Sequence, residues 1–405
     1  MTRSSWRAFI GLLVFTMGTS IITPLLPLYA ERFELGAGML TLLFAAYSGT
    51  VVPTMLVMGS LSDRIGRKRV MLPAMAIITG ASLVFAMSDS VPLLFLGRVL
   101  QGLAIGSFLG VGTAFVVDHA RAERRAWAAM IAGLGFRLGF GLGPGLAGVV
   151  AEYASDPTHR PFEGHVILMA LAILAVLLAP ETITRRRPPR LEVRVGVPRG
   201  QMRGFATFIG PAGFLMSFLD ATLLSVVPLY IFQTLEYRNV AVVGLVGFLI
   251  LGMGGFTPFI FGRIEPRRGV MVGIACSSLA SLLVVAAAGI GTVALVVVAA
   301  AVIGFTNGVI LQSGTAICGI AVPLHDRGKL ISAFYMCCYA GTLPTVGLGY
   351  LSGAVGLTST LMVFSGVALL IAAFILLVGS RLFREVIPHV EAQAIADRPL
   401  EEVAA

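Results

Sequence analysis

Charged side chains are scarce in this chain. Of its 405 residues, 12% are Asp, Glu, Lys or Arg and 57% are hydrophobic, and the mean hydropathy is +0.93. Soluble proteins carry about 25% charged residues, so this chain has too few charges to cover a particle surrounded by water. We therefore predict an integral membrane protein whose solvent is lipid.

Patterns for catalysis and for metal binding are also missing from the sequence. Its four cysteines and five histidines show no metal-ligand spacing, and the sequence contains no nucleophile elbow or phosphate loop. The histidines are predicted in loops, at helix ends or in the tail, at His119, His159, His165, His325 and His389. We therefore expect neither an enzyme nor a bound cofactor. A membrane enzyme or a sensor without transport activity stays the alternative from another class.

Long apolar stretches dominate what is present. A stretch of about 20 apolar residues spans a bilayer, and helices satisfy their backbone hydrogen bonds within such a stretch. The sequence predicts twelve membrane helices, near 7–30, 38–60, 71–88, 92–117, 126–150, 163–181, 204–231, 240–262, 270–289, 292–318, 330–353 and 358–379.

The net charge of +9 follows the alternation of the loops. Of the 29 lysines and arginines, 24 precede the first stretch or lie in alternate loops and the tail. The opposite loops hold only Arg32, Arg160 and Arg238, and Arg98 and Arg137 lie inside stretches. Basic residues mark cytoplasmic loops, so we expect a multi-pass protein of the inner membrane with both termini in the cytoplasm. The basic residues are also placed to contact lipid, and no nucleic acid partner is expected.

The chain divides into two similar halves. Residues 182–203 form an Arg- and Pro-rich linker, predicted to be cytoplasmic, between bundles at 1–181 and 204–380, and 381–405 form a tail. The tripeptide Pro-Leu-Tyr at 27–29 returns at 228–230, and Gly-Thr-Ala at 112–114 returns at 314–316. Gly102 and Gly106 return as Gly304 and Gly308. Repeats of this kind place a substrate site near the membrane midplane, between the halves.

A charged segment interrupts the apolar sequence at residues 59–69, which read GSLSDRIGRKR. It resembles the loop between the second and third helices of the major facilitator superfamily. The resemblance implies an all-α fold of twelve transmembrane helices in two pseudo-symmetric six-helix bundles. It also implies a cytoplasmic latch between the halves, formed by Gly59, Asp63, Arg64, Gly66, Arg67, Asp118 and Arg121. A second copy at 262–269 has Pro266 where the first has the aspartate, so its acid contact is weakened or re-routed.

Arg98 lies in the run LGRVLQG at residues 96–102. This run resembles the arginine motif of the superfamily's fourth helix, and the resemblance implies a role in proton coupling. Because a buried arginine costs at least a few kcal/mol in lipid, Arg98 is expected to face a cavity. Alternatively, its side chain snorkels to the headgroups from near the start of the helix.

Glycines at 135, 139 and 143 share one helix face, which suits close packing against another helix, and Pro144 adds a bend. With Gly148 they resemble the antiporter motif of drug/proton exchangers, although Ala147 stands where that motif has glycine. The resemblance favours export over uptake. Arg137 lies inside this motif, and three roles stay open for it: binding an anionic substrate, pairing with Asp220, or anchoring locally.

Asp220 is the only acid well inside a predicted helix. A carboxylate surrounded by lipid either takes up a proton or finds a cation, so Asp220 is the leading candidate for carrying protons. The competing interpretation is a structural partner for an arginine or for a polar group of the stretch 292–318. Drug exporters often carry an acid in the first helix, and this chain has none there.

Six other polar residues are predicted near the midplane of helices that line a cavity: Thr23, Tyr29, Gln101, Thr222, Asn307 and Gln312. Each contacts either the substrate or a neighbouring helix. We expect a monomeric secondary transporter that exports small amphipathic compounds by alternating access and uses the proton gradient. The alternative is an uptake carrier or uniporter for an organic anion or sugar, with Arg98 and Arg137 as anion ligands.

Overall fold

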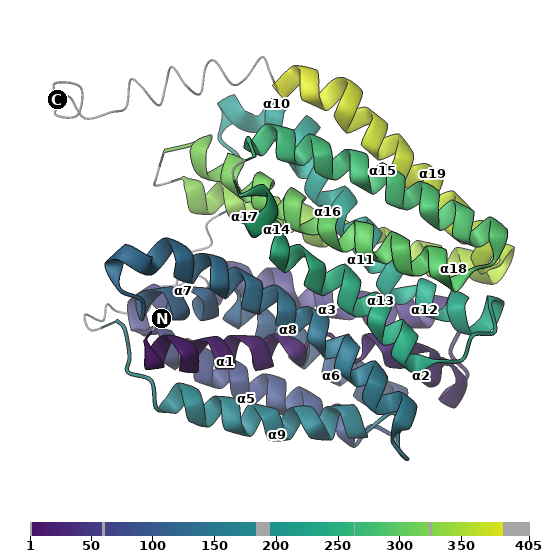
Figure 1. The fold of residues 1–405 in the computed structure, drawn as a ribbon, viewed down its shortest axis with the longest axis horizontal. Helices are drawn as coiled ribbons and strands as arrows, with labels where there is room; N and C mark the ends of the chain where they lie inside the picture. Colours follow the sequence, from purple (N-terminus) through teal and green to yellow (C-terminus); the bar gives the residue numbers. More distant parts are fainter. Residues whose placement is uncertain (1, 59–60, 184–194, 263, 324–325, 384–405) are drawn as a thin grey trace.

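The structure is a computed structural model that describes residues 2–58, 61–183, 195–262, 264–323 and 326–383. Within these ranges the chain forms helices joined by short turns, with no strand. Figure 1 shows two groups of helices, one from the purple-to-teal half of the chain and one from the teal-to-yellow half.

The first bundle comprises α1 (Arg3–Met17), η1 (Thr23–Leu25), α2 (Leu26–Arg32), α3 (Ala37–Met58), α4 (Ser62–Ile65), α5 (Arg67–Ala86), α6 (Val91–Phe108), α7 (Val111–Asp118), η2 (Ala122–Arg124), α8 (Arg125–Tyr153) and α9 (Arg160–Leu177). The second bundle comprises η3 (Arg199–Gln201), α10 (Met202–Gly204), η4 (Phe205–Ile209), α11 (Gly210–Ser225), α12 (Val227–Leu229), η5 (Tyr230–Thr234), α13 (Val240–Gly252), η6 (Met253–Phe256), α14 (Thr257–Phe261), α15 (Pro266–Ile290), α16 (Val293–Ile320), α17 (Arg327–Ala340), α18 (Pro344–Val355), α19 (Leu357–Phe374) and η7 (Ile375–Gly379).

The predicted fold class is confirmed. Eleven helical segments of the described chain are long and apolar enough to cross a membrane. The remaining predicted segment, near 7–30, is also helical, but it is divided into α1, η1 and α2 and is therefore not a continuous span. Residues 184–194 of the predicted linker and 384–405 of the predicted tail lie outside the described residues.

The first membrane segment is broken between Gly18 and Ile22, where the chain forms turns. Pro24 and Pro27 follow the break, and neither can donate a backbone hydrogen bond. A second break lies in the fourth segment at Gly110, whose φ of 82° favours glycine. The sequence predicted the extent of both segments but not their interruptions.

The glycine repeat has the same structural role in both bundles. A Cβ atom at Gly102 would meet the carbonyl of Tyr47 at 2.5 Å, and one at Gly106 would meet the carbonyl of Val51 at 2.8 Å, so α6 lies directly against α3. In the second bundle, an added Cβ atom at Gly304 would collide with the carbonyl of Leu249 in α13. One at Gly308 would collide with the carbonyl of Gly254 in η6. Both pairs of glycines therefore allow close helix–helix packing.

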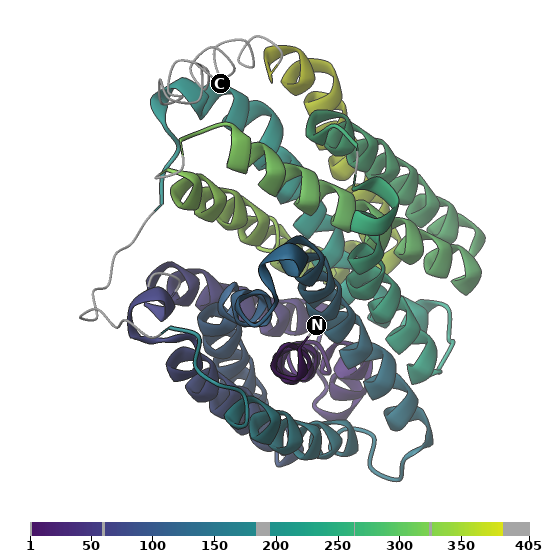
Figure 2. The same cartoon turned by 60° about the vertical axis from the view of Figure 1, so that its left-hand side comes forward.

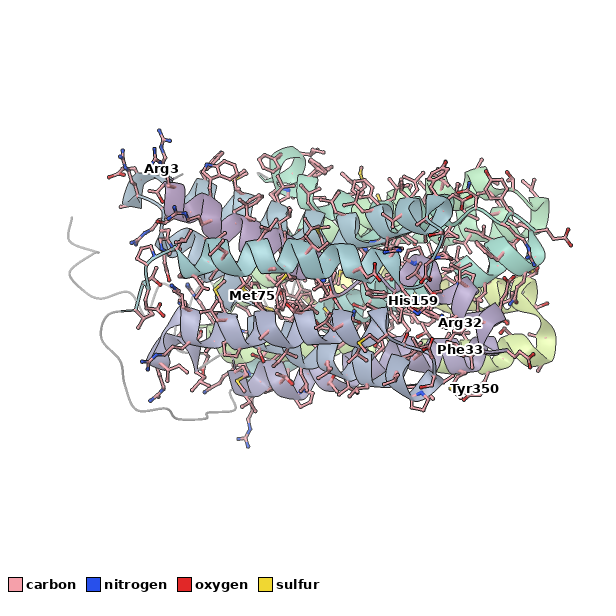
Figure 3. The ribbon with its side chains drawn as sticks, turned by 90° about the horizontal axis from the view of Figure 1, so that it is seen from below. Arg3, Arg32, Phe33, Met75, His159 and Tyr350 are labelled. Atoms are coloured by element: carbon pink, nitrogen blue, oxygen red, sulfur yellow. The ribbon has the colours of Figure 1, made fainter. Side chains whose placement is uncertain are left out.

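The two bundles meet most closely at one end of the molecule. Figure 3 shows Arg3 at one end, and Arg32, Phe33, His159 and Tyr350 toward the other. At the second end, Glu152 at the end of α8 accepts a hydrogen bond from the backbone N–H of Val240 (2.7 Å), and Arg238 pairs with Glu31 (3.1 Å). Figure 2 shows the two bundles side by side.

Candidate functional site: a cavity between the bundles

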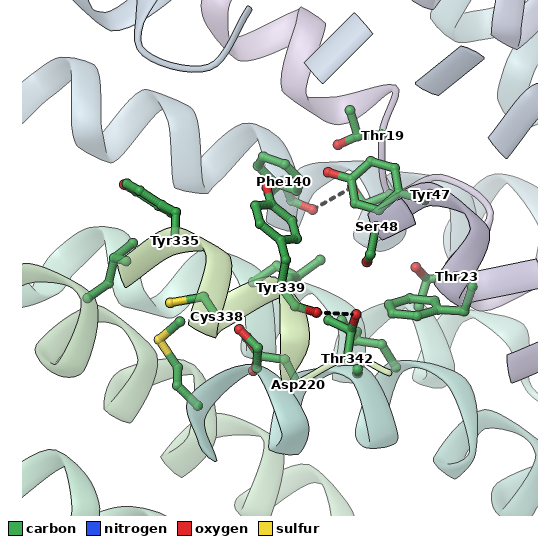
Figure 4. Close-up of a pocket in the computed structure, with 18 of the residues that line it drawn as sticks. Thr19, Thr23, Tyr47, Ser48, Phe140, Asp220, Tyr335, Cys338, Tyr339 and Thr342 are labelled. Carbon is green, nitrogen blue, oxygen red and sulfur yellow. Dashed lines mark hydrogen bonds between the residues drawn. The ribbon is translucent and has the colours of Figure 1, made fainter. Parts of the chain in front are cut away.

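A cavity of about 210 Å³ lies between the two bundles. Figure 4 shows Asp220 on one side of it and Thr19 and Tyr47 on the other. The first bundle contributes Thr19, Ser20, Thr23, Phe44, Tyr47, Ser48, Arg98, Leu109, Phe136, Arg137 and Phe140. The second contributes Met216, Ser217, Asp220, Ala221, Leu224, Leu251, Leu311, Tyr335, Cys338, Tyr339 and Thr342. Residues far apart in the sequence thus share one site.

Arg98 is buried at the first-bundle wall, with 2% of its surface exposed. Its guanidinium donates hydrogen bonds to the carbonyls of Leu43 (3.1 Å) and Phe44 (2.8 Å) of α3. The guanidinium also lies over the ring of Tyr47, 4.7 Å from its centroid. This position corresponds to the predicted cavity-facing arginine and not to snorkelling, because the charged group is enclosed by protein.

Gln101 supports Arg98 and the broken first segment. Its Oε1 accepts a hydrogen bond from Arg98 Nη1 (2.9 Å), and its Nε2 donates to the carbonyl of Gly18 (2.7 Å). Arg98 Nη1 also approaches the carbonyl of Thr19 (3.5 Å). Side chains of α6 therefore satisfy backbone carbonyls at the break, and these bonds hold the polar turn beside the cavity.

Asp220 projects from α11 and is held by Asn307 of α16. The Asn307 amide Nδ2 donates a hydrogen bond to the Asp220 carboxylate. Arg137, from α8 of the other bundle, donates from Nη2 to the backbone carbonyl of Asn307 (3.4 Å). The charges of Arg137 and Asp220 interact electrostatically, without a direct salt bridge between them. Asn307 therefore links an acid of one bundle to a base of the other.

Gly254 makes room for Arg137. A Cβ atom at this position would lie 2.7 Å from Arg137 Nη1 and 3.0 Å from the carbonyl of Gly304. The guanidinium thus reaches from α8 across the bundle boundary to a gap between η6 and α16.

Several predicted cavity residues do not line the cavity. The Tyr29 hydroxyl donates to the carbonyl of Thr158 (3.3 Å), in the loop before α9. Gln101 and Asn307 hold charged neighbours, as described above. The buried side-chain oxygens of Thr222 (Oγ1) and Gln312 (Oε1) have no hydrogen-bond partner in the described part of the chain. Among the six polar residues predicted to lie near the midplane, Thr23 lines the cavity.

The sequence did not predict the aromatic and hydroxyl groups that line the cavity. Tyr47, Tyr335 and Tyr339 line it, together with Phe136 and Phe140. Tyr335 and Tyr339 are four residues apart, and so are the two phenylalanines, so each pair shares one helix face. This spacing was the available signal, but aromatic pairs in an apolar helix occur equally where the helix packs against its neighbours.

The glycines of α8 form two packing faces. Added Cβ atoms at Gly135, Gly139 and Gly143 would collide with the first segment, near Phe9, Thr16 and Met17. On the other face, a Cβ at Gly148 would lie 2.8 Å from the Cα of Gly244, in α13 of the second bundle. Pro144 also packs against α13, next to Gly247. The helix with the antiporter-like motif therefore packs against helices of both bundles.

The charged segment contains a network within the first bundle. Arg67 Nε pairs with Asp118 (3.3 Å), and Arg67 Nη1 donates to Ser62 Oγ (2.9 Å). Gly66 precedes α5 with a φ of 115°, which favours glycine. These contacts of Arg67 lie within one bundle and do not join the two. Gly59 and the side chain of Asp63 lie outside the described residues, and Arg64 follows Asp63 in α4.

Glu181, which follows α9, caps the N-terminus of another helix. Its two carboxylate oxygens accept the backbone N–H groups of Arg67 (3.0 Å) and Lys68 (3.0 Å), the first residues of α5. A carboxylate at a helix N-terminus is stabilising. Arg121 stands apart from this network and lines a second pocket with Arg124 at the end of the bundle.

The prediction for one histidine was wrong. His165 lies inside α9 and is buried, with Nδ1 2.8 Å from Ser82 Oγ and Nε2 3.0 Å from the carbonyl of Val14. Hydrogen bonds to these two groups offset the cost of burying the imidazole ring. The sequence did not predict that Ser82 and Val14 lie beside His165. His325 and His389 lie outside the described residues.

The chain belongs to the Major Facilitator Superfamily, a family of membrane transporters, because the family model matches residues 8–345. It is 25% identical over 207 residues to Multidrug resistance protein 1 of Bacillus subtilis, covering 51% of this chain and 50% of that protein. It is 26% identical over 184 residues to Quinolone resistance protein NorA of Staphylococcus aureus, covering 44% and 45% respectively. The chain thus spans about half the length of the curated relatives it matches.

Solved structures show the same fold. The peptide transporter POT in complex with sulfate superposes with a TM-score of 0.78 at 13% identity, covering 95% of this chain and 96% of that one. A mutant form of the nucleoside transporter NupG gives a TM-score of 0.72 at 15% identity, covering 92% and 99%.

Proposed function

We propose that this protein is a proton-coupled secondary transporter that exports small amphipathic compounds by alternating access. The observation that carries the proposal is the position of Asp220, the only carboxylate lining the cavity formed by the described residues. It faces an apolar and aromatic space that suits an amphipathic substrate. Export is supported by the antiporter-like glycines of α8 and by the relatives named for multidrug and quinolone resistance.

The mechanism we propose uses Asp220 as the proton carrier. When the carboxylate is ionised, it attracts Arg137 of the opposite bundle, and protonation removes this attraction. The protonation state of one side chain thereby biases the relative position of the two bundles. Arg98 is placed as a supporting residue, because carbonyls and Gln101 hold its charge in the adjacent wall.

We further propose that the basic end of the molecule, which carries Arg3, Arg67 and Arg125, lies in the cytoplasm, with both termini there and the chain in the inner membrane. The contacts between Glu152 and Val240 and between Arg238 and Glu31 then close the outer side, so that the structure faces inward. Because one chain supplies both walls of the cavity, a monomer is sufficient for this mechanism. No cofactor is needed besides the proton gradient.

The test uses purified protein in sealed vesicles that contain a pH-sensitive dye. Lipophilic cations, neutral drugs and organic anions are added against an imposed proton gradient, to wild type, Asp220→Asn, and the exposed control Glu163→Gln. We expect compound-driven proton movement that is lost in Asp220→Asn and kept in the control. Substrate flux that ignores the gradient and survives Asp220→Asn would refute proton coupling.

A second candidate function is uptake of an organic anion. The observation that favours it is Arg137, a base that lines the cavity and has few acceptors for its N–H groups. In the same vesicle experiment, this function predicts inward flux of an anion that is independent of the imposed proton gradient.

A further inference from the structure

The cavity contains charges of both signs, and the two bundles contribute them. Arg98 and Arg137 come from the first bundle, and Asp220 comes from the second. The three groups differ in how many of their hydrogen-bonding positions are already used by other residues of the protein. This difference indicates which of them is available to a substrate.

Arg98 is occupied by the protein. Its Nε, Nη1 and Nη2 atoms all donate to acceptors, namely three backbone carbonyls and the Gln101 side chain. A guanidinium has five N–H groups, so at most one is left. The faces of Phe44 and Tyr47 cover the group as well. Arg98 therefore organises its wall and has little capacity for a ligand.

Arg137 is largely available. Among the described residues, its guanidinium has one hydrogen-bond acceptor, the carbonyl of Asn307 at a long 3.4 Å. It lines the cavity, and no carboxylate of the described chain forms a salt bridge with it. The Arg137 side chain is half-buried beside the cavity, and a carboxylate can accept two N–H groups of a guanidinium in a bidentate arrangement. Arg137 is thus suited to hold an anionic group of a substrate.

Asp220 provides the complementary position. Asn307 donates to Oδ1, so the second carboxylate oxygen has no protein donor in the described residues. A purely cationic substrate would satisfy Asp220 and leave Arg137 without an anion. A purely anionic one would satisfy Arg137 but face the carboxylate of Asp220. A substrate with both charges satisfies both residues.

We propose that the substrates are zwitterionic aromatic compounds, whose anionic group binds Arg137 and whose ammonium group binds ionised Asp220. Tyr47, Phe140 and Tyr339 supply the apolar faces for the aromatic body between the charges. This inference rests on the proposed function, since a proton and the ammonium group then compete for Asp220, as exchange of substrate for protons requires. Arg137 is the residue that determines specificity.

The test compares three probes on one scaffold: 4-(aminomethyl)benzoate as the zwitterion, benzylamine as the cation and 4-methylbenzoate as the anion. Binding to purified protein is measured by calorimetry, and flux is measured in vesicles. The variants are Arg137→Gln, Arg137→Lys, Asp220→Asn and the exposed control Arg203→Gln. Thermal unfolding checks that each variant is folded.

We expect wild type and Arg203→Gln to bind the zwitterion about tenfold more tightly than either single-charge probe. Arg137→Gln should remove the advantage over benzylamine, Arg137→Lys should restore part of it, and Asp220→Asn should remove the advantage over 4-methylbenzoate. Equal or tighter binding of benzylamine by wild type, unchanged in Arg137→Gln, would overturn the inference. Selective binding of the zwitterion without any flux would instead overturn the proposed transport and leave the assignment of the site intact.

Discussion

The two bundles share backbone positions but not charges. Gly102 in the first and Gly304 in the second both bring a central helix against its neighbour. In the first bundle, Arg67 of the charged segment pairs with Asp118, and its backbone N–H donates to Glu181. In the second, the corresponding segment has an exposed pair between Glu265 and Arg268, with 52% and 77% of the two side chains accessible.

This difference distinguishes the residues that specify the fold from those that line the cavity. The glycines repeated in both halves stand where a side chain would prevent close helix packing, so they specify the fold. Positions that differ include Arg137, Asp220 and the cap of the charged segment. These asymmetric residues define the cavity and the end of the molecule that carries the charged segment. The comparison predicts that matched substitutions have equal effects at repeated positions and unequal effects elsewhere.

The largest effect on stability is expected at the repeated glycines. Gly102→Ala would push a methyl group against Tyr47 and Thr50 of α3, and Gly304→Ala would do the same against the backbone of Leu249 in α13. Overpacking of this kind costs about 1–3 kcal/mol. We expect both variants to lower the thermal unfolding midpoint in detergent by several degrees and by similar amounts.

Matched controls exist in both bundles. An added Cβ at Gly80 of α5 or at Gly366 of α19 meets no atom within 4 Å, so alanine there should leave the midpoint unchanged or raise it slightly, because alanine favours helix. If Gly102→Ala were as stable as Gly80→Ala, the close packing of α6 on α3 would be wrong.

The sequence predicted the twelve segments and the glycine repeat because both depend on local, periodic properties: apolar length and the absence of side chains. It also singled out Arg98, Arg137 and Asp220, because a charge inside an apolar stretch must face protein or a cavity. It did not distinguish Thr23, which lines the cavity, from Asn307, which holds Asp220. Both are polar residues at similar depth, and their roles depend on which helix lies opposite.

A smaller and unequal effect is expected at the two charged segments. Glu181→Ala removes the carboxylate that accepts two N–H groups at the start of α5, and loss of such a cap costs about 1 kcal/mol. Glu265→Ala breaks an exposed pair, which contributes about 0–1 kcal/mol. The thermal midpoint should therefore fall measurably for Glu181→Ala and hardly for Glu265→Ala. Equal losses in the two variants would contradict the asymmetry of the segments.

The smallest effect on the thermal midpoint is expected at the end where the bundles meet, because substitutions there change the populations of two folded states. Glu152→Ala removes the half-buried carboxylate that accepts the Val240 N–H across the boundary, at a cost of about 1 kcal/mol. This corresponds to a roughly fivefold shift toward the state open at that end. Glu31→Ala removes only an exposed ion pair with Arg238, so its shift should be less than about twofold.

Spin labels at Ser155→Cys and Tyr237→Cys report this opening, because the two positions are exposed and lie on opposite bundles at this end. The labels are introduced into a variant in which alanine replaces the four native cysteines, and distance distributions are measured by double electron–electron resonance. A larger long-distance fraction in Glu152→Ala than in Glu31→Ala is expected, since a charge on a helix N-terminus is less screened than an exposed pair. The reverse order would mean that the contact of Glu152 with α13 does not hold the bundles together.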